Sequence, residues 1–195
     1  MTPDSFTKPP RKPRADGERN RARLIEAARK VFAEKGAGAG LEQVAREAEV
    51  GIGTLYRHFR SRDALITSIY QQEIDTLIDA APALMNELEP LPALREWLLQ
   101  FVDFLETKQG MADVLSTLIG GTAALYSGTS ECLAHAIEAL TANAVDEGAL
   151  DLDLEPLDLL RAIGGVANLT PGENWRQSAV QMIDLLLKGM QRDSD

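Results

Sequence analysis

The sequence predicts an all-α protein with an N-terminal three-helix helix-turn-helix domain and a larger helical domain behind it. Three observations support this fold class. Apolar residues recur at spacings of three and four along most of the 195-residue chain, without the alternation that strands show. Ala and Leu are abundant while aromatic residues make up only 5 %, a balance that favours helix. Two short amphipathic patterns joined by a glycine-bearing turn, within residues 41–59, indicate a helix-turn-helix unit.

Charge is divided unevenly along the chain. Through Arg62, Lys and Arg outnumber Asp and Glu by 14 to 8, whereas the remaining residues carry a net charge of −16. A basic head on an acidic body indicates that only the head meets a polyanion. The alternative interpretation is an incidental division of solvated surface charge.

Residues 1–18 are expected to form a disordered basic arm, since they hold several prolines and almost no apolar residue. Arg11, Lys12 and Arg14 are the candidate DNA contacts in this arm, because such a segment can follow the groove or backbone of a duplex. The first helix is expected from about Arg19 to Lys35, where Gly36 ends the apolar pattern.

The helix-turn-helix domain is expected to occupy residues 19–62. A Gly-rich loop at 36–40 precedes a helix over 41–48, a turn over 50–53 and a second short helix over 54–59. A helix of this kind places its outer side in the major groove. Thr54, Tyr56, Arg57 and His58 are left for that side, and their hydroxyl and basic groups suit phosphate contacts. Arg57 can also read a guanine edge with two hydrogen bonds.

Residues 63–195 are expected to form the second, all-helical domain. Ser61 is the predicted cap of its first helix, which extends to about Ala80, and Pro82, Pro90 and Pro92 interrupt the chain after it. The periodicity predicts further helices over residues 93–108, 111–118, 130–147, 157–169 and 173–191.

Residues 24–70 resemble the DNA-binding region of the tetracycline-repressor (TetR) family. The matching stretches are Leu24–Ala28, Phe32–Gly36, Val44-Ala45, Gly53–Phe59 and Ser61–Leu65. The resemblance implies a cytoplasmic transcriptional regulator, not an enzyme, that binds a near-palindromic operator in double-stranded DNA as a homodimer. It also implies a repressor that a small-molecule effector releases from DNA.

Carried over position by position, the resemblance implies a set of DNA-contacting residues: Ile52, Thr54, Tyr56, Arg57, His58 and Arg62. Tyr56 and His58 match residues that touch phosphates, and Thr54 matches one that meets the backbone or a base. Arg62 matches a basic phosphate contact at the head of the connecting helix. Ile52 and Arg57 occupy variable positions that set specificity.

The chain departs from the family pattern at two places. Gly40-Leu41 stands where the family often has Thr or Ser, and glycine caps a helix without offering a hydroxyl. Glu49 replaces a glycine in the turn, so we expect strain or reshaping there.

TetR-like proteins dimerise through their last two long helices. The resemblance therefore implies an interface at Gly164, Gly165, Val180, Ile183 and Leu187, with packing into the subunit's own core as the alternative. The middle helices would enclose an effector, and their candidate pocket residues are Trp97, Phe101, Phe104, Leu115, Leu118, Tyr126, His135 and Trp175. For each of these residues, plain core packing is the alternative.

No acid–base pair, nucleophile arrangement or metal-ligand spacing stands out, so no cofactor or metal is expected. The single cysteine, Cys132, cannot form an intramolecular disulfide, and we expect it to be buried and inert, with a redox sensor as the alternative. No apolar run approaches the roughly 18 residues of a membrane span, which predicts no membrane partner. A DNA-binding protein without an effector, an activator, and an all-helical enzyme or binding module are the competing interpretations.

Overall fold

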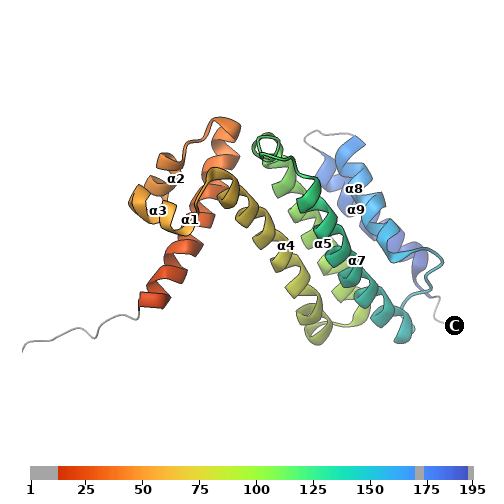
Figure 1. Ribbon diagram of the computed structural model, residues 1–195. Helices are drawn as coiled ribbons and strands as arrows, with labels where there is room; N and C mark the ends of the chain where they lie inside the picture. Colours follow the sequence, from red (N-terminus) through yellow and green to blue (C-terminus); the bar gives the residue numbers. More distant parts are fainter. Residues whose placement is uncertain (1–12, 170–173, 193–195) are drawn as a thin grey trace, which may run out of the picture. The chain divides into compact units, whose positions relative to one another are not determined.

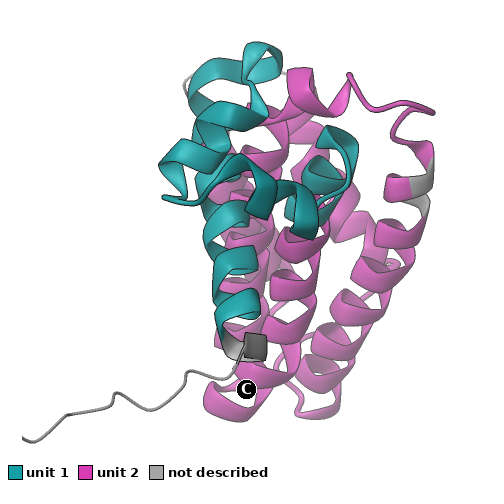
Figure 2. Ribbon diagram, turned by 60° about the vertical axis from the view of Figure 1, so that its left-hand side comes forward, with its two compact units in different colours: residues 1–69 teal, residues 70–195 magenta. Residues whose placement is uncertain are grey.

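The computed structural model describes residues 13–169 and 174–192 and divides into two compact units at Ile69/Tyr70 (Figure 2). This division lies seven residues beyond the boundary expected after Arg62. Unit 1 contains α1 (Pro13–Lys35), the short 3-10 helix η1 (Gly36–Gly38), α2 (Leu41–Glu47), α3 (Ile52–His58) and the start of α4 (Arg62–Glu87).

Unit 2 begins inside α4 and is a bundle of long helices. It contains the rest of α4, then α5 (Pro90–Gly110), α6 (Ala112–Leu115), α7 (Ala123–Asp146), α8 (Pro156–Leu169) and α9 (Trp175–Met190). Helix α5 packs against α7, α8 and α9, which run beside it in Figure 1. Across residues 13–169 and 174–192 the only β-type pairing is an isolated bridge between Leu150 and Gln191, which confirms the all-α prediction.

Each unit has its own apolar core. Leu24 and Phe32 of α1, Val44 of α2 and Leu55 of α3 are fully buried in unit 1, at the helical spacings seen in the sequence. In unit 2, Trp97 is fully buried and its indole Nε1 donates a hydrogen bond of 2.7 Å to the Leu77 carbonyl, so the ring's polar atom is satisfied.

Several helices begin or end elsewhere than the sequence predicted, and prolines account for most of the differences. Helix α1 begins at Pro13, so residues 13–18 of the expected disordered arm are helical. Helix α5 starts at Pro90 instead of Ala93. Proline suits a helix's first turn, where its missing N–H has no intrahelical partner to lose.

Helix α4 continues through Pro82 to Glu87, although the sequence predicted an end near Ala80. Pro82 is exposed, so water can reach the backbone carbonyl that its missing N–H leaves unpaired. The buried Ala81 beside it continues the apolar side of the helix. Within the described residues, no helix is long and apolar enough to cross a membrane.

Candidate nucleic-acid interface and ligand cavity

Helices α2 and α3 form the predicted helix-turn-helix, and backbone groups define its turn. Gly40 is the N-cap of α2 and Gly51 the N-cap of α3, and neither supplies a side-chain hydrogen bond. Glu49 has a φ of +53°, the left-handed conformation expected where the family has glycine. The Val50 N–H then bonds the Ala45 carbonyl at 2.9 Å and closes the turn.

Helix α3 turns its apolar side inward and presents polar and basic groups outward. Leu55 is fully buried, whereas Ile52 is 37 % exposed and Tyr56 49 % exposed. Arg57 is also exposed, and Thr54 and His58 are half-buried. No Asp or Glu occurs between Val50 and Arg62, so the outer surface of α3 carries only positive charge.

Arg57 folds back on its own helix in the free protein. Its Nε donates to the Gly53 carbonyl at 3.2 Å, and its guanidinium lies 3.5 Å from the Thr54 hydroxyl. These contacts hold the exposed side chain against the first turn of α3. They are weak enough to be exchanged for a base edge or a phosphate.

Arg62, which was expected to contact a phosphate, also makes contacts within the protein. One guanidinium nitrogen donates to the Ala37 carbonyl at 2.8 Å, and the guanidinium carbon lies 5.1 Å from the centre of the Phe32 ring. The side chain thus ties the head of α4 to η1 and α1. Ser61, just before it, accepts a 3.1 Å hydrogen bond from the Ala64 N–H and is the cap predicted from sequence.

Two further cations join this surface, and sequence reasoning did not single them out. Arg46 of α2 and Arg60 after α3 are both exposed, and no ion pair involves either among the contacts of the described residues. By contrast, Arg23 pairs with Glu49 at 2.7 Å and Lys30 with Glu47 at 2.6 Å. Arg60 lies between the matching stretches Gly53–Phe59 and Ser61–Leu65, so its charge at that place could have indicated it.

The candidates in the basic arm fall at the edge of the structure. Arg11 and Lys12 lie outside the described residues, as does the side chain of Arg14.

Helices α8 and α9 divide the predicted dimer-interface residues between two faces. Gly164, Gly165 and Val180 are only partly buried, but Ile183 and Leu187 are buried in their own subunit. For these last two the structure agrees with the alternative of packing into the subunit's own core, because the inward stripe of α9 packs on α5 and α8. Large apolar side chains that do face outward are Leu169, 83 % exposed, and Leu185, 65 % exposed.

The two consecutive glycines of α8 are not required by packing inside the subunit. A Cβ built on Gly164 or Gly165 would meet nothing within 4 Å. Each mid-helix glycine costs about 1 kcal/mol of stability relative to Ala.

The eight candidate pocket residues do not come together as one site. Trp97, Phe101 and Leu118 are buried in the core, His135 is exposed and Trp175 is partly exposed at the start of α9. Only Leu115 and Tyr126 line a first cavity of unit 2, and Phe104 lines a second one. Helical periodicity identifies an inward face, but it does not distinguish a filled core position from a cavity wall.

The first cavity lies among α5, α6, α7 and α8 and has a volume of about 230 Å³. Its lining is partly apolar and partly polar: Leu105, Lys108, Gln109, Ala112, Leu115, Ser116, Thr122, Tyr126, Ala167 and Asn168. Lys108, Gln109 and Asn168 were not among the expected residues. A polar side chain on an otherwise apolar helix face was the signal in the sequence.

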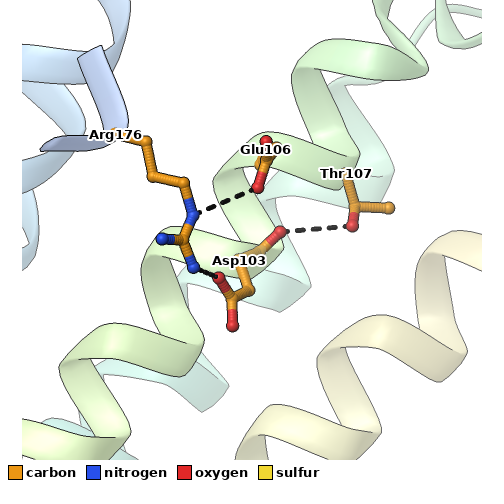
Figure 3. Close-up of polar contacts among 4 residues, drawn as sticks. All are labelled: Asp103, Glu106, Thr107 and Arg176. Atoms are coloured by element: carbon orange, nitrogen blue, oxygen red, sulfur yellow. Dashed lines mark hydrogen bonds and ion pairs between the residues drawn. The ribbon is translucent and has the colours of Figure 1, made fainter. Parts of the chain in front are cut away.

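The second cavity, of about 290 Å³, is bordered by carboxylates and lies on another side of α5. Asp103 in its wall is already paired, because Arg176 in the first turn of α9 bonds Asp103 and reaches Glu106 at 3.3 Å (Figure 3). Thr107 in turn donates to the Asp103 carbonyl at 3.2 Å. The contacts of Arg176 with Asp103 and Glu106 raise the pKa of Arg176 and hold α9 to α5.

Cys132 is exposed on α7, contrary to the expectation of a buried thiol. Position 132 falls on the outer side of a helix whose inner side carries Leu133, Ala136 and Ile137. Within residues 13–169 and 174–192, no three His, Cys, Asp or Glu side chains gather as metal ligands would.

Comparison with known proteins matches two parts of the chain to two family models of transcriptional regulators. Residues 24–69 match the family model of bacterial regulatory proteins of the tetR family. Residues 89–192, more than half of the chain, match the C-terminal domain described as that of SbtR-like transcriptional regulators.

Two solved structures are similar to this chain over nearly their whole length. A TetR transcriptional regulator from Streptomyces coelicolor is 37 % identical, covers 89 % of this chain and 99 % of its own, and superposes with a TM-score of 0.79. A TetR transcription regulatory protein from Mycobacterium vanbaalenii is 26 % identical, covers 92 % of this chain and 99 % of its own, with a TM-score of 0.74.

Curated relatives match over a shorter stretch. An HTH-type transcriptional regulator of Staphylococcus aureus is 32 % identical over 93 residues, 45 % of this chain and 50 % of the relative. The chain thus spans about half the length of the curated relatives it matches.

Proposed function

The chain belongs to the TetR family of bacterial regulatory proteins, and on that premise we propose that it is a DNA-binding repressor whose dimer leaves its operator when a small molecule binds. The observation that supports DNA binding most strongly is the outer surface of α3. It combines exposed Ile52, Tyr56 and Arg57 with basic flanking residues and no carboxylate from Val50 to Arg62. These are the groups that phosphates and base edges require.

Dimerisation follows from the task of α3. A single seven-residue helix reads only a few base pairs, whereas two such helices spaced by about 34–36 Å read the two halves of a near-palindromic operator. The outward face of α8 and α9 is the proposed interface. Its open glycines at 164 and 165 allow close helix approach, and exposed Leu185 supplies apolar surface to bury.

Effector control is supported by the cavity in unit 2 and by the course of α4. This helix starts at Arg62, which is bonded to unit 1, and continues without interruption into unit 2. The dimer is proposed to exchange between a conformation whose α3 helices are spaced for DNA and one in which they are not. An effector that binds the second conformation more tightly weakens operator binding by the difference in its affinity for the two, typically ~1–3 kcal/mol. A partly polar cavity favours this over a regulator without an effector. The proposed site of action is the cytoplasm.

The direct test is to mix the purified protein with fragmented DNA of its source genome, recover the bound fragments and sequence them. We expect a near-palindromic sequence, enriched beside a small number of genes. Arg57→Ala should recover a more degenerate sequence, because the residue is proposed to read a base. Recovery of random fragments by the wild-type protein would contradict the proposal.

Salt dependence tests the individual contacts. Arg60→Ala should lower the slope of log affinity against log salt by about 1 per subunit, since one phosphate-bound cation is lost. Tyr56→Phe removes a neutral hydroxyl and should weaken all DNA equally without changing the slope. Glu138→Ala, a charge change on the exposed side of α7 in unit 2, is the control, with no expected change. An Arg60→Ala slope equal to that of the wild type would remove this residue from the interface.

A further inference from the structure

Among the residues that the structure describes, Lys108 is the one cation in the wall of the first cavity of unit 2, and no carboxylate of those residues lines that cavity with it. The side chain is half-buried, and burial lowers the pKa of its ammonium group. Its Nζ lies 4.3 Å from the centre of the Tyr126 ring, and the attraction between the ammonium group and the ring face partly stabilises the charge. Among the described contacts, no ion pair involves Lys108.

Three other cations of this acidic unit take part in ion pairs. Arg95 pairs with Asp184, Arg161 with Asp158, and Arg176 with Asp103. With a net charge of −16 after Arg62, the body has ample carboxylates to pair with a lysine. None of the ion pairs among the described residues uses Lys108, and a partly buried ammonium group at the wall of a cavity carries a desolvation cost that a bound anion would offset.

The neighbouring polar side chains already donate to backbone carbonyls. Gln109 donates to Ala167, Ser116 to Asp113 and Asn168 to Gly164, each at 2.7 Å. These bonds fix the wall of the cavity, and they leave the Lys108 ammonium as its charged donor. Leu105, Ala112 and Leu115 form the apolar part of the lining.

We propose that this cavity binds a small organic carboxylate, with its anionic group on Lys108 Nζ and its apolar body against Leu105 and Leu115. The volume of about 230 Å³ lies below the roughly 300–1,000 Å³ of pockets for drug-sized ligands, so the acid is small. This inference rests on the proposed function and deepens it, because it names the chemical class of the effector.

The first test is thermal unfolding of the full-length protein with hexanoate and benzoate, each against its neutral amide. We expect the acids to raise the unfolding temperature in a concentration-dependent way and the amides to do so far less. Lys108→Met keeps the length and apolar stem of the side chain without its charge. It should weaken acid binding by at least about tenfold, as for loss of a charged hydrogen bond.

Lys35→Met carries the same change on an exposed lysine at the end of α1 and should retain the acid response. An unfolding temperature of ligand-free Lys108→Met at or above that of the wild type shows that the variant is folded. Equal stabilisation by acid and amide, the same response in Lys108→Met as in the wild type, or no response to any acid would each overturn the proposal.

Operator binding separates this inference from the proposed function. If the protein binds its operator and the acids release it only when Lys108 is present, both stand. If it binds the operator but no acid stabilises it, the carboxylate proposal fails and the regulator remains. If acids bind at Lys108 but no operator is recovered, the ligand class stands and the proposed function fails.

Discussion

Glu49 occupies a backbone conformation that few side chains adopt. Its φ of +53° is imposed by the turn between α2 and α3, where a backbone bond from Val50 to Ala45 follows directly. A residue with a Cβ in this region costs roughly 1–2 kcal/mol relative to glycine. The exposed ion pair with Arg23 offsets only part of that cost.

Glu49→Gly should therefore raise the free energy of unfolding, by roughly 0.5–1 kcal/mol, measured by denaturant titration. Arg23→Ala is the matched control, because it removes the same ion pair and leaves the backbone unchanged. It should cost less than about 0.5 kcal/mol. A less stable Glu49→Gly would show that the ion pair outweighs the backbone strain.

Arg62 is expected to stabilise the folded protein, whether or not DNA is bound. Arg62→Ala removes the bond to the Ala37 carbonyl and the contact with Phe32, and should cost about 1–3 kcal/mol of unfolding free energy. Arg62→Lys keeps the charge but not the planar guanidinium, so it should lose a similar amount. If Arg62→Lys is as stable as the wild type, the residue's charge alone matters, as the phosphate interpretation assumed.

At the scale of elements, the outward face of α8 and α9 carries the proposed dimer. Leu185→Glu should convert the protein to a monomer, measured by light scattering across a dilution series, because a carboxylate would be buried without a partner. Gly165→Leu should act similarly by blocking close approach.

The control is Gly128→Leu on α7, where a Cβ also meets nothing within 4 Å. It should leave the protein dimeric. A dimeric Leu185→Glu at low concentration would place the interface elsewhere.

The Arg95–Asp184 pair joins α5 to α9 at 2.7 Å and gives a pH dependence with a defined sign. The hydrogen bond from Arg95 lowers the pKa of Asp184, so its contribution is present above the unfolded value, about 3.9, and is lost as the pH falls through the lower folded value. Asp184→Asn should unfold at a temperature lower by roughly 1–2 °C at pH 7. The difference should vanish as the pH is lowered below about 3.9, whereas a constant difference would rule out this titration.

The sequence predicted some elements well because their signals are local. Ser61, the turn at Glu49 and the apolar stripe of α1 each depend on a few neighbouring residues, and the structure bears them out. The predicted end of α4 near Ala80 was wrong, because whether a proline such as Pro82 ends a helix depends on what surrounds the carbonyl that it leaves unpaired. Most residues of the cavity around Lys108 were not predicted, because an unfilled space depends on how four helices pack together. The periodicity of one helix carries no information about that packing.

At the scale of the whole molecule, the charge division sets how the protein meets DNA. The chain carries −10 overall, so its body repels a polyanion while the head attracts it. Binding to random DNA should therefore be weak and fall steeply between 50 and 200 mM salt, whereas operator binding keeps its base contacts. A ratio of operator to random affinity that falls with salt, in filter-binding titrations, would contradict this.

The exposed position of Cys132, the one thiol in the chain, has a practical consequence. A nitroxide can be attached there without replacing any other residue. In a symmetric dimer the two labels would report a single interspin distance across the molecule. That distance gives pulsed electron paramagnetic resonance a direct scale on which to follow any rearrangement of α7 as acid or operator is added.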